Sequence, residues 1–198
     1  GSRRALYAWA LYDLANTTFS LNVVSRYLPL LVVQDLGGRD LDVSLAYSGA
    51  MIVVALTAPL LGALSDQSGR RLPFLALATA CCIVATALMG LGKPASVVLL
   101  LFAIATYFYQ AALVFYDALL WHIASPTRLG QASGFGAAFG YLGSMAGLLF
   151  LWPFVRHGGH QAAFIPAACF FLLFALPSFL LIREPATRRA IAWRATIP

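Results

Sequence analysis

The sequence has 198 residues, of which 61% are hydrophobic and only 10% are charged. An ordinary soluble domain carries about 25% charged residues, so the composition excludes a water-soluble globule and predicts an integral membrane protein, with the lipid bilayer as a partner. The net charge of +6 comes from basic residues spread over short loops. There it indicates membrane topology, and we expect no nucleic-acid partner.

Six apolar runs are long enough to cross about 30 Å of hydrocarbon as helices, which takes about 20 residues each. Short polar or Gly/Pro-containing breaks separate them, and nothing remains for a soluble domain. We therefore predict an all-α membrane protein, in which residues 1–182 form a six-helix transmembrane bundle and residues 183–198 form a basic cytoplasmic tail. The predicted spans are 5–33, 43–64, 73–91, 97–123, 129–155 and 161–182.

The basic residues are distributed unevenly between the two ends of the predicted bundle. Nine of the thirteen lie at the end that carries both termini, three lie at the opposite end, and Arg26 lies within the first span. Cytoplasmic loops of membrane proteins are enriched in Lys and Arg. The asymmetry therefore predicts that both termini are cytoplasmic, in a multi-pass protein of the cell (inner) membrane.

A loop motif follows the second predicted span and reads Gly-Ala-Leu-Ser-Asp-Gln-Ser-Gly-Arg-Arg. Its first glycine allows a neighbouring helix to approach closely, and its second permits a tight turn. The segment resembles the G-x-L-[AS]-D-x-x-G-R-[RK] signature of the major facilitator superfamily, although a generic basic turn is the simpler alternative. The resemblance implies a cytoplasmic gating motif made of Gly62, Asp66, Gly69, Arg70 and Arg71.

Two further segments resemble the vacuole effluxer-like branch of this superfamily. The first span contains Tyr-Asp-Leu-Ala-Asn-Thr-Thr-Phe from Tyr12, and the fourth contains Phe-Tyr-Asp-Ala-Leu-Leu from Phe115. Two positions depart from the branch pattern, because Leu14 replaces a tryptophan and Asp117 replaces an asparagine. The resemblance implies half of a major facilitator fold, a 3+3 inverted repeat, since such transporters normally have twelve spans in two similar halves.

Polar side chains recur at helical spacing in the first and fourth spans. A polar group at bilayer depth is costly, so these faces are predicted to border one aqueous path. In the first span the spacing i, i+3, i+4 and i+7 defines the stripe. The candidate substrate or proton pathway is Asp13, Asn16, Thr17, Ser20, Tyr107, Gln110 and Asp117, with Arg26 as a further candidate.

Asp13 and Asp117 are expected at similar depth, differing by only about 3 Å at a rise of 1.5 Å per residue. We expect both to take up protons during transport, unless either carboxylate merely binds a neighbouring Tyr, Asn or Ser. Arg26 lies near the outer end of its span. There it either extends to the outer interface or holds an anionic substrate.

The fifth span is rich in glycine at small-xxx-small spacing, which permits close backbone contact between helices. This contact is predicted either within the chain or in a parallel homodimer, whose two-fold axis along the membrane normal would reproduce the two halves of a full transporter. The interface residues are Gly136, Gly140, Gly143 and Gly147.

The sequence lacks the residue patterns of metal sites and hydrolases, so we expect no metal, no cofactor and no enzymatic activity. We predict a half-sized secondary active transporter, a symporter or antiporter that moves a small solute by alternating access. By resemblance the solute is an amino acid or related metabolite, and proton coupling and homodimer formation are further expectations. The alternatives are an inactive half that needs a partner half, a channel, or an intramembrane enzyme.

Overall fold

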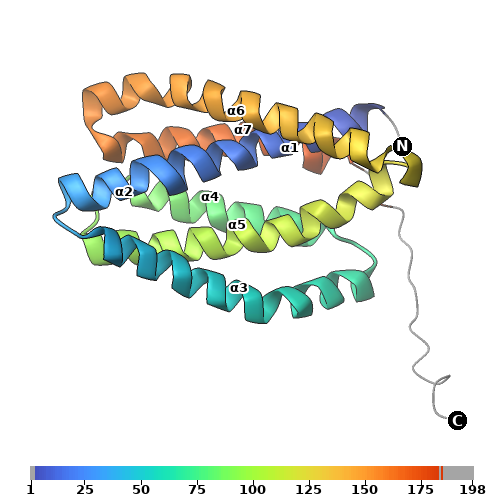
Figure 1. Cartoon of the computed structure of the whole chain (residues 1–198), viewed down its shortest axis with the longest axis horizontal. Coiled ribbons are helices and arrows are strands. Elements are labelled where there is room, and N and C mark those ends of the chain that lie inside the picture. The colour runs from blue at the N-terminus through green and yellow to red at the C-terminus, as the bar shows by residue number, and fades with distance from the viewer. Residues whose placement is uncertain (1–2, 183, 185–198) are drawn as a thin grey trace, which may run out of the picture.

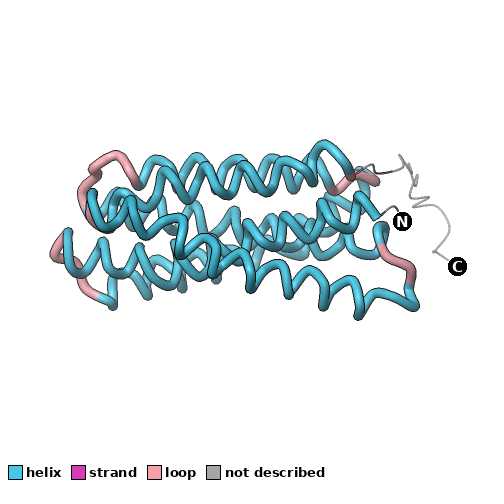
Figure 2. The backbone as a smooth tube through the Cα atoms, turned by 90° about the horizontal axis from the view of Figure 1, so that it is seen from above, coloured by secondary structure: helices cyan, strands magenta, loops and turns pink. Residues whose placement is uncertain are grey.

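The described residues form a bundle of helices that run along its longest axis, with loops only at the two ends (Figure 1 and Figure 2). A computed structural model describes residues 3–182 and 184, and these residues contain no strand. The elements in chain order are α1 (Arg3–Thr18), η1 (Phe19–Tyr27), α2 (Leu28–Leu30), η2 (Leu31–Asp35), α3 (Asp40–Ser68), α4 (Leu72–Met89), α5 (Ala95–Ile123), η3 (Pro126–Arg128), α6 (Leu129–Gly158), η4 (His160–Ala163) and α7 (Phe164–Leu181).

Five helical segments within the described residues are long and apolar enough to cross a membrane. They are α3, α4, α5, α6 and η4 with α7, and they correspond to the second through sixth predicted spans. The all-helical membrane fold predicted from composition is therefore confirmed. Several helices extend beyond the apolar runs, because polar residues continue the helices past the hydrocarbon boundary.

The first predicted span differs from a single α-helix. Residues 3–35 are helical without interruption, but α-helical and π-helical stretches alternate along them. Pro29 lies just after η1, and a proline inside a helix removes one backbone hydrogen bond and displaces the preceding turn. In that turn the Ser25 hydroxyl donates to the Ser20 carbonyl oxygen at 3.0 Å.

The helices pack in an exchanged pattern. α1 packs on α6 and α7, α5 packs on α3 and α4, and α4 contacts α7. The first three spans (α1, α3 and α4) and the last three (α5, α6 and α7) form two sets, and the first helix of each set lies against the other set. The list of contacts is the same when the two sets change places (Figure 1). Because α1 and α5 run in opposite directions, this is the packing of a 3+3 inverted repeat.

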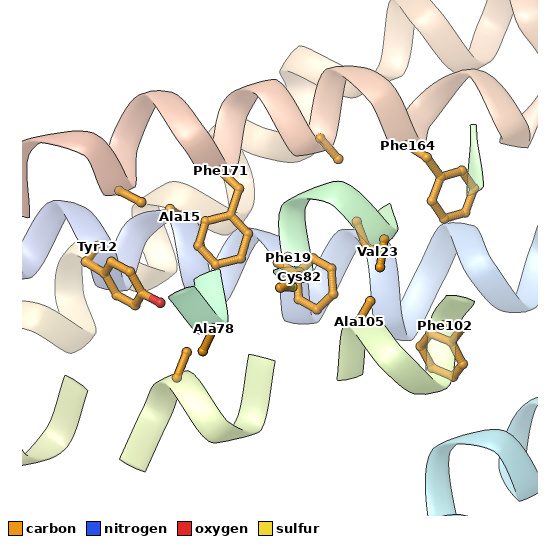
Figure 3. Close-up of a cluster of buried hydrophobic side chains, with 14 of the residues drawn as sticks. Tyr12, Ala15, Phe19, Val23, Ala78, Cys82, Phe102, Ala105, Phe164 and Phe171 are labelled. Carbon is orange, nitrogen blue, oxygen red and sulfur yellow. The ribbon is translucent and has the colours of Figure 1, made fainter. Parts of the chain in front are cut away.

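The core lies along one face of α1 and η1, where their side chains meet those of α4, α5 and α7 (Figure 3). Tyr12 is fully buried there, and its hydroxyl is 2.7 Å from that of Thr79 on α4. Lipid tails are as apolar as leucine, so close fit and such hydrogen bonds hold membrane helices together more than hydrophobic burial does. The labelled core side chains are Tyr12, Ala15, Phe19, Val23, Ala78, Cys82, Phe102, Ala105, Phe164 and Phe171.

Candidate functional site

Two aromatic residues join α1 to α5, and we call this contact the α1–α5 junction. The rings of Trp9 and Tyr116 stack with their centroids 4.6 Å apart. The Trp9 Nε1–H donates to the Tyr116 carbonyl oxygen at 3.3 Å, and the Tyr116 hydroxyl donates to the Trp9 carbonyl oxygen at 3.2 Å. Because both residues are buried, this reciprocal pair fixes the register between the two helices.

Asp13 and Asp117 flank this aromatic pair. Asp13 follows Trp9 by about one turn of α1, and Asp117 directly follows Tyr116 on α5. Asp13 is half-buried, Asp117 is exposed, and the two carboxylates lie close enough to interact electrostatically. The structure thus places both carboxylates of the sequence-based hypothesis at the α1–α5 junction.

The remaining polar residues of α1 and η1 have different surroundings. Asn16 is only 4% exposed, and its Oδ1 has no hydrogen-bond partner among the described residues. Thr17 borders Gly140 of α6. Ser20 instead lines a pocket of about 410 Å³ together with Val24, Ser25, Val43, Ser44, Tyr47, Ser48 and Phe102.

A π-helical stretch begins just before Ser20. The predicted stripe assumes about 3.6 residues per turn throughout. The backbone becomes π-helical at Phe19, where hydrogen bonds close between residues five apart and the turn is wider. Residues toward the end of η1 therefore depart from the α-helical register. Ser20, at its second position, borders α3 and α5, whereas Thr17 borders α6.

The polar residues of α5 and Arg26 complete the predicted pathway residues. Tyr107 and Gln110 are half-buried on α5. Thr106 is fully buried, and its Oγ1 has no hydrogen-bond partner within the described part of the chain. Arg26 is exposed near the end of η1, outside the α1–α5 junction, with its guanidinium carbon 5.7 Å from the centroid of the Tyr27 ring.

The four predicted interface glycines of α6 face α1 of the same chain. All four are buried, and a Cβ atom at any of them would overlap atoms of α1 or η1. This is the first of the two predicted roles, packing within the chain, and α1 occupies the surface that a second copy would need. The α1 and η1 partners are Trp9 for Gly136, Asp13 and Thr17 for Gly140, Leu14 for Gly143, and Thr18 and Asn22 for Gly147.

The predicted gating motif forms a charged cluster at the end of the bundle that carries residue 3. Gly69 ends α3 with a φ of 65°, a left-handed conformation that glycine adopts easily. Asp66 accepts a hydrogen bond from Arg71 at 2.6 Å, and the same guanidinium lies 2.8 Å from the His122 ring at the end of α5. Gly62 has open space where a Cβ would lie, so no close helix approach requires a glycine there.

Glu184 is a member of this cluster that sequence reasoning missed. Its carboxylate accepts hydrogen bonds from the backbone amides of Arg71 and Leu72, both at 2.8 Å. These amides begin α4, where the first turn of a helix has no internal acceptors and favours a negative charge. Arg70 is exposed beside this contact. The only sequence signal was an acidic residue just after the last span.

Acidic and histidine side chains are otherwise dispersed. No group of three His, Cys, Asp or Glu residues in the described ranges 3–182 and 184 is arranged to hold a metal ion. At the opposite end of the bundle His160 and Asp35 pair at 2.9 Å, which links η4 to η2.

A sequence model of the Major Facilitator Superfamily matches residues 14–196. The chain belongs to the major facilitator superfamily. This superfamily consists of transporters and not enzymes, so the prediction that the chain is not an enzyme is confirmed at the level of the family. The superfamily resemblance of the loop motif is likewise confirmed, whereas the comparisons give no support for a particular branch.

Two curated relatives are similar over much of the chain. An uncharacterized protein of Aquifex aeolicus is 31% identical over 182 residues, which cover 90% of this chain and 45% of the relative. The uncharacterized MFS-type transporter YxiO of Bacillus subtilis is 28% identical over 146 residues, covering 69% of this chain and 34% of the relative. The chain therefore spans less than half the length of these relatives. No solved structure matches.

Proposed function

We propose that this chain forms one six-helix half of a secondary active transporter that moves a small solute by alternating access. The observation that carries the proposal is the α1–α5 junction of a major facilitator protein, which brings Asp13 and Asp117 within electrostatic range. Ionisable residues in transmembrane segments are costly and mark substrate, ion or proton pathways. The same chemistry suits symport or antiport coupled to protons.

The α1–α5 junction is suited to couple proton binding to helix movement, because few other contacts join these two helices. The Trp9–Tyr116 pair holds them together next to the carboxylates. A change in charge at Asp13 or Asp117 therefore acts beside the contact that holds α1 against α5. Substrate binding and protonation would bias the relative position of the two helices through this contact, to which the Tyr12 ring adds a second stack on Tyr116.

We further propose that a second six-helix half completes the transport path. The chain covers less than half of each curated relative. Several large apolar side chains on the outward face of α6 are more than two thirds exposed, among them Tyr141, Met145 and Leu149. A second copy of the chain, in the same orientation, is our candidate for that half.

The mass of the particle in lipid nanodiscs, measured by native mass spectrometry at several protein-to-lipid ratios, tests this assembly. A stable dimer that loses its second copy in a Met145→Arg variant supports a homodimer through α6. A persistent monomer at every ratio assigns the second half to another polypeptide segment. Leu56→Arg is the matched control, because Leu56 is as exposed as Met145 and lies near the middle of α3, as Met145 lies near the middle of α6.

The substrate class and branch rest on the sequence motifs. Tyr12, Asp13 and Asn16 in the first span and Tyr116 in the fourth match the vacuole effluxer-like pattern, and that resemblance favours an amino acid or related metabolite. In the structure the two tyrosines are buried and hydrogen-bonded. The branch motifs therefore hold the helices beside the carboxylates in register.

Transport in proteoliposomes tests the function. Vesicles are loaded with an amino-acid mixture, a pH gradient is imposed, and efflux of each compound is followed by mass spectrometry. We expect gradient-driven efflux that falls at least tenfold in Asp13→Asn, and a smaller loss in Asp117→Asn because Asp117 is exposed. Asp40→Asn, which removes an exposed carboxylate at the start of α3, is the control. Proton coupling that survives both junction substitutions would refute the assigned roles.

A further inference from the structure

A pocket of about 360 Å³ opens at the end of the bundle where α1 begins. It lies where α1 begins, α5 ends and α6 begins, and it has no part in the α1–α5 junction or the gating motif. Its walls combine two arginines and two neutral polar residues with apolar side chains. The lining residues are Arg3, Leu6, Ile123, Ala124, Ser125, Arg128, Gln131, Ala132 and Phe135.

The two arginines of this pocket lack acidic partners. No carboxylate lines the pocket, and neither Arg3 nor Arg128 makes an ion pair with any described residue. The acidic residues at the same end of the bundle, Asp66 and Glu184, are engaged with Arg71 and the start of α4. Two arginines lining one cavity without a counter-charge favour an anionic ligand.

The chemistry of the lining indicates which anion. Guanidinium groups bind phosphate oxygens in a fork geometry, and Ser125 and Gln131 add neutral hydrogen-bond donors. Leu6, Ile123 and Phe135 line the same cavity. A small soluble anion has no apolar part to pack against these side chains. The pocket lies at the ends of the spanning helices, and helix ends reach the level of the lipid headgroups.

We propose that this pocket binds the phosphate headgroup of an anionic phospholipid, with Arg3 and Arg128 on the phosphate and the apolar wall against the upper part of an acyl chain. Bound there, the lipid would link the start of α1 to the turn between α5 and α6. The proposal is independent of the transported solute, because the pocket does not include the candidate pathway residues.

Native mass spectrometry of the full chain, in phosphatidylcholine nanodiscs containing a minor fraction of phosphatidylglycerol, tests the proposal. We expect wild-type protein to retain phosphatidylglycerol in preference to phosphatidylcholine by about tenfold or more. The double variant R3Q/R128Q should lose this preference. R4Q/R70Q removes the same charge from exposed residues at the same end and should keep it, which separates a built site from general surface attraction.

A further pair of measurements excludes misfolding and a soluble ligand. R3K/R128K preserves the charge, so it should recover part of the preference, and equal thermal unfolding midpoints show that the variants are folded. Inorganic phosphate added to pure phosphatidylcholine nanodiscs should not shift the unfolding midpoint. Equal loss of preference in R3Q/R128Q and R4Q/R70Q, no preference in the wild type, or an arginine-dependent shift by phosphate alone would each overturn the lipid assignment.

Discussion

Gly143 marks a very close approach between α6 and α1. A Cβ atom built on it would lie 2.6 Å from the Leu14 carbonyl oxygen and 2.9 Å from the Leu14 Cα. Backbone atoms cannot move aside as the tip of a flexible side chain can, so any larger residue must push the two helices apart. The glycine is therefore a packing requirement of this helix pair and not only a favourable small residue.

We expect Gly143→Ala to lower the free energy of unfolding by about 1–3 kcal/mol, the usual cost of overpacking a well-packed contact. Thermal unfolding in detergent, followed by tryptophan fluorescence, measures the change. Gly134 on the same helix is the matched control, because a Cβ there would meet no atom within 4 Å. Gly134→Ala should be neutral or slightly stabilising, since alanine favours helices by about 1 kcal/mol over glycine. Equal effects of the two substitutions would contradict the close α1–α6 contact.

At the scale of the element, α4 begins on a carboxylate supplied from the far end of the chain. Glu184 lies 113 residues from Arg71 in sequence, yet it accepts the amide hydrogens of Arg71 and Leu72. It thereby ties the segment after α7 to the loop between α3 and α4. The same loop carries the Asp66–Arg71 pair, so the gating motif and the end of the six-helix bundle share one charged cluster.

Glu184→Gln keeps one acceptor oxygen but removes the charge that faces the start of α4. We expect a loss of about 1 kcal/mol in local stability, as for other carboxylates at helix N-termini. Hydrogen exchange of the first-turn amides of α4 should accelerate several-fold, while exchange in α6 should not change. Asp40→Asn, in the first turn of α3, serves as the control. Exchange at α4 that stays unchanged in Glu184→Gln would show that the carboxylate contributes nothing there.

Sequence patterns could predict the spans but not the contacts that define this cluster. The lengths of the apolar runs suffice for helices α3 to α7, because the bilayer dictates about 20 residues per crossing. The alternation of α- and π-helical turns in residues 3–35 was not predictable from spacing, since it depends on local backbone adjustment around Pro29. The Glu184 contact was equally hidden, because its partners are backbone amides, which any residue other than proline supplies.

At the scale of the whole molecule, glycine spacing predicted a close helix contact without indicating the partner. The answer came from the exchanged packing, in which α1 joins α6 and α7 instead of its sequence neighbours α3 and α4. Hydropathy is a local property of the sequence, so it does not predict which distant helices pack together. The resemblance of the loop motif gave the superfamily correctly, because that signature depends on a short local run of residues.

The orientation of the bundle is the remaining whole-molecule prediction. The structure places η3 at the end of the bundle where α1 begins and the loop between α4 and α5 at the opposite end (Figure 1). Five basic residues that the structure describes lie at the first end and three lie at the opposite end, so the positive-inside rule predicts that the first end is cytoplasmic. Thr127 and Lys93 are exposed at the respective ends and are suitable reporter positions.

We expect a membrane-impermeant maleimide to label Lys93→Cys on intact cells and Thr127→Cys only after permeabilisation. Both variants need a background in which Cys81, Cys82 and Cys169 are replaced by alanine, since Cys169 is exposed. The reverse labelling would invert the bundle and contradict the charge argument. Labelling of both positions on intact cells would show insertion in two orientations. In that case two copies could not share one orientation throughout, and the proposed parallel homodimer would be refuted for that population.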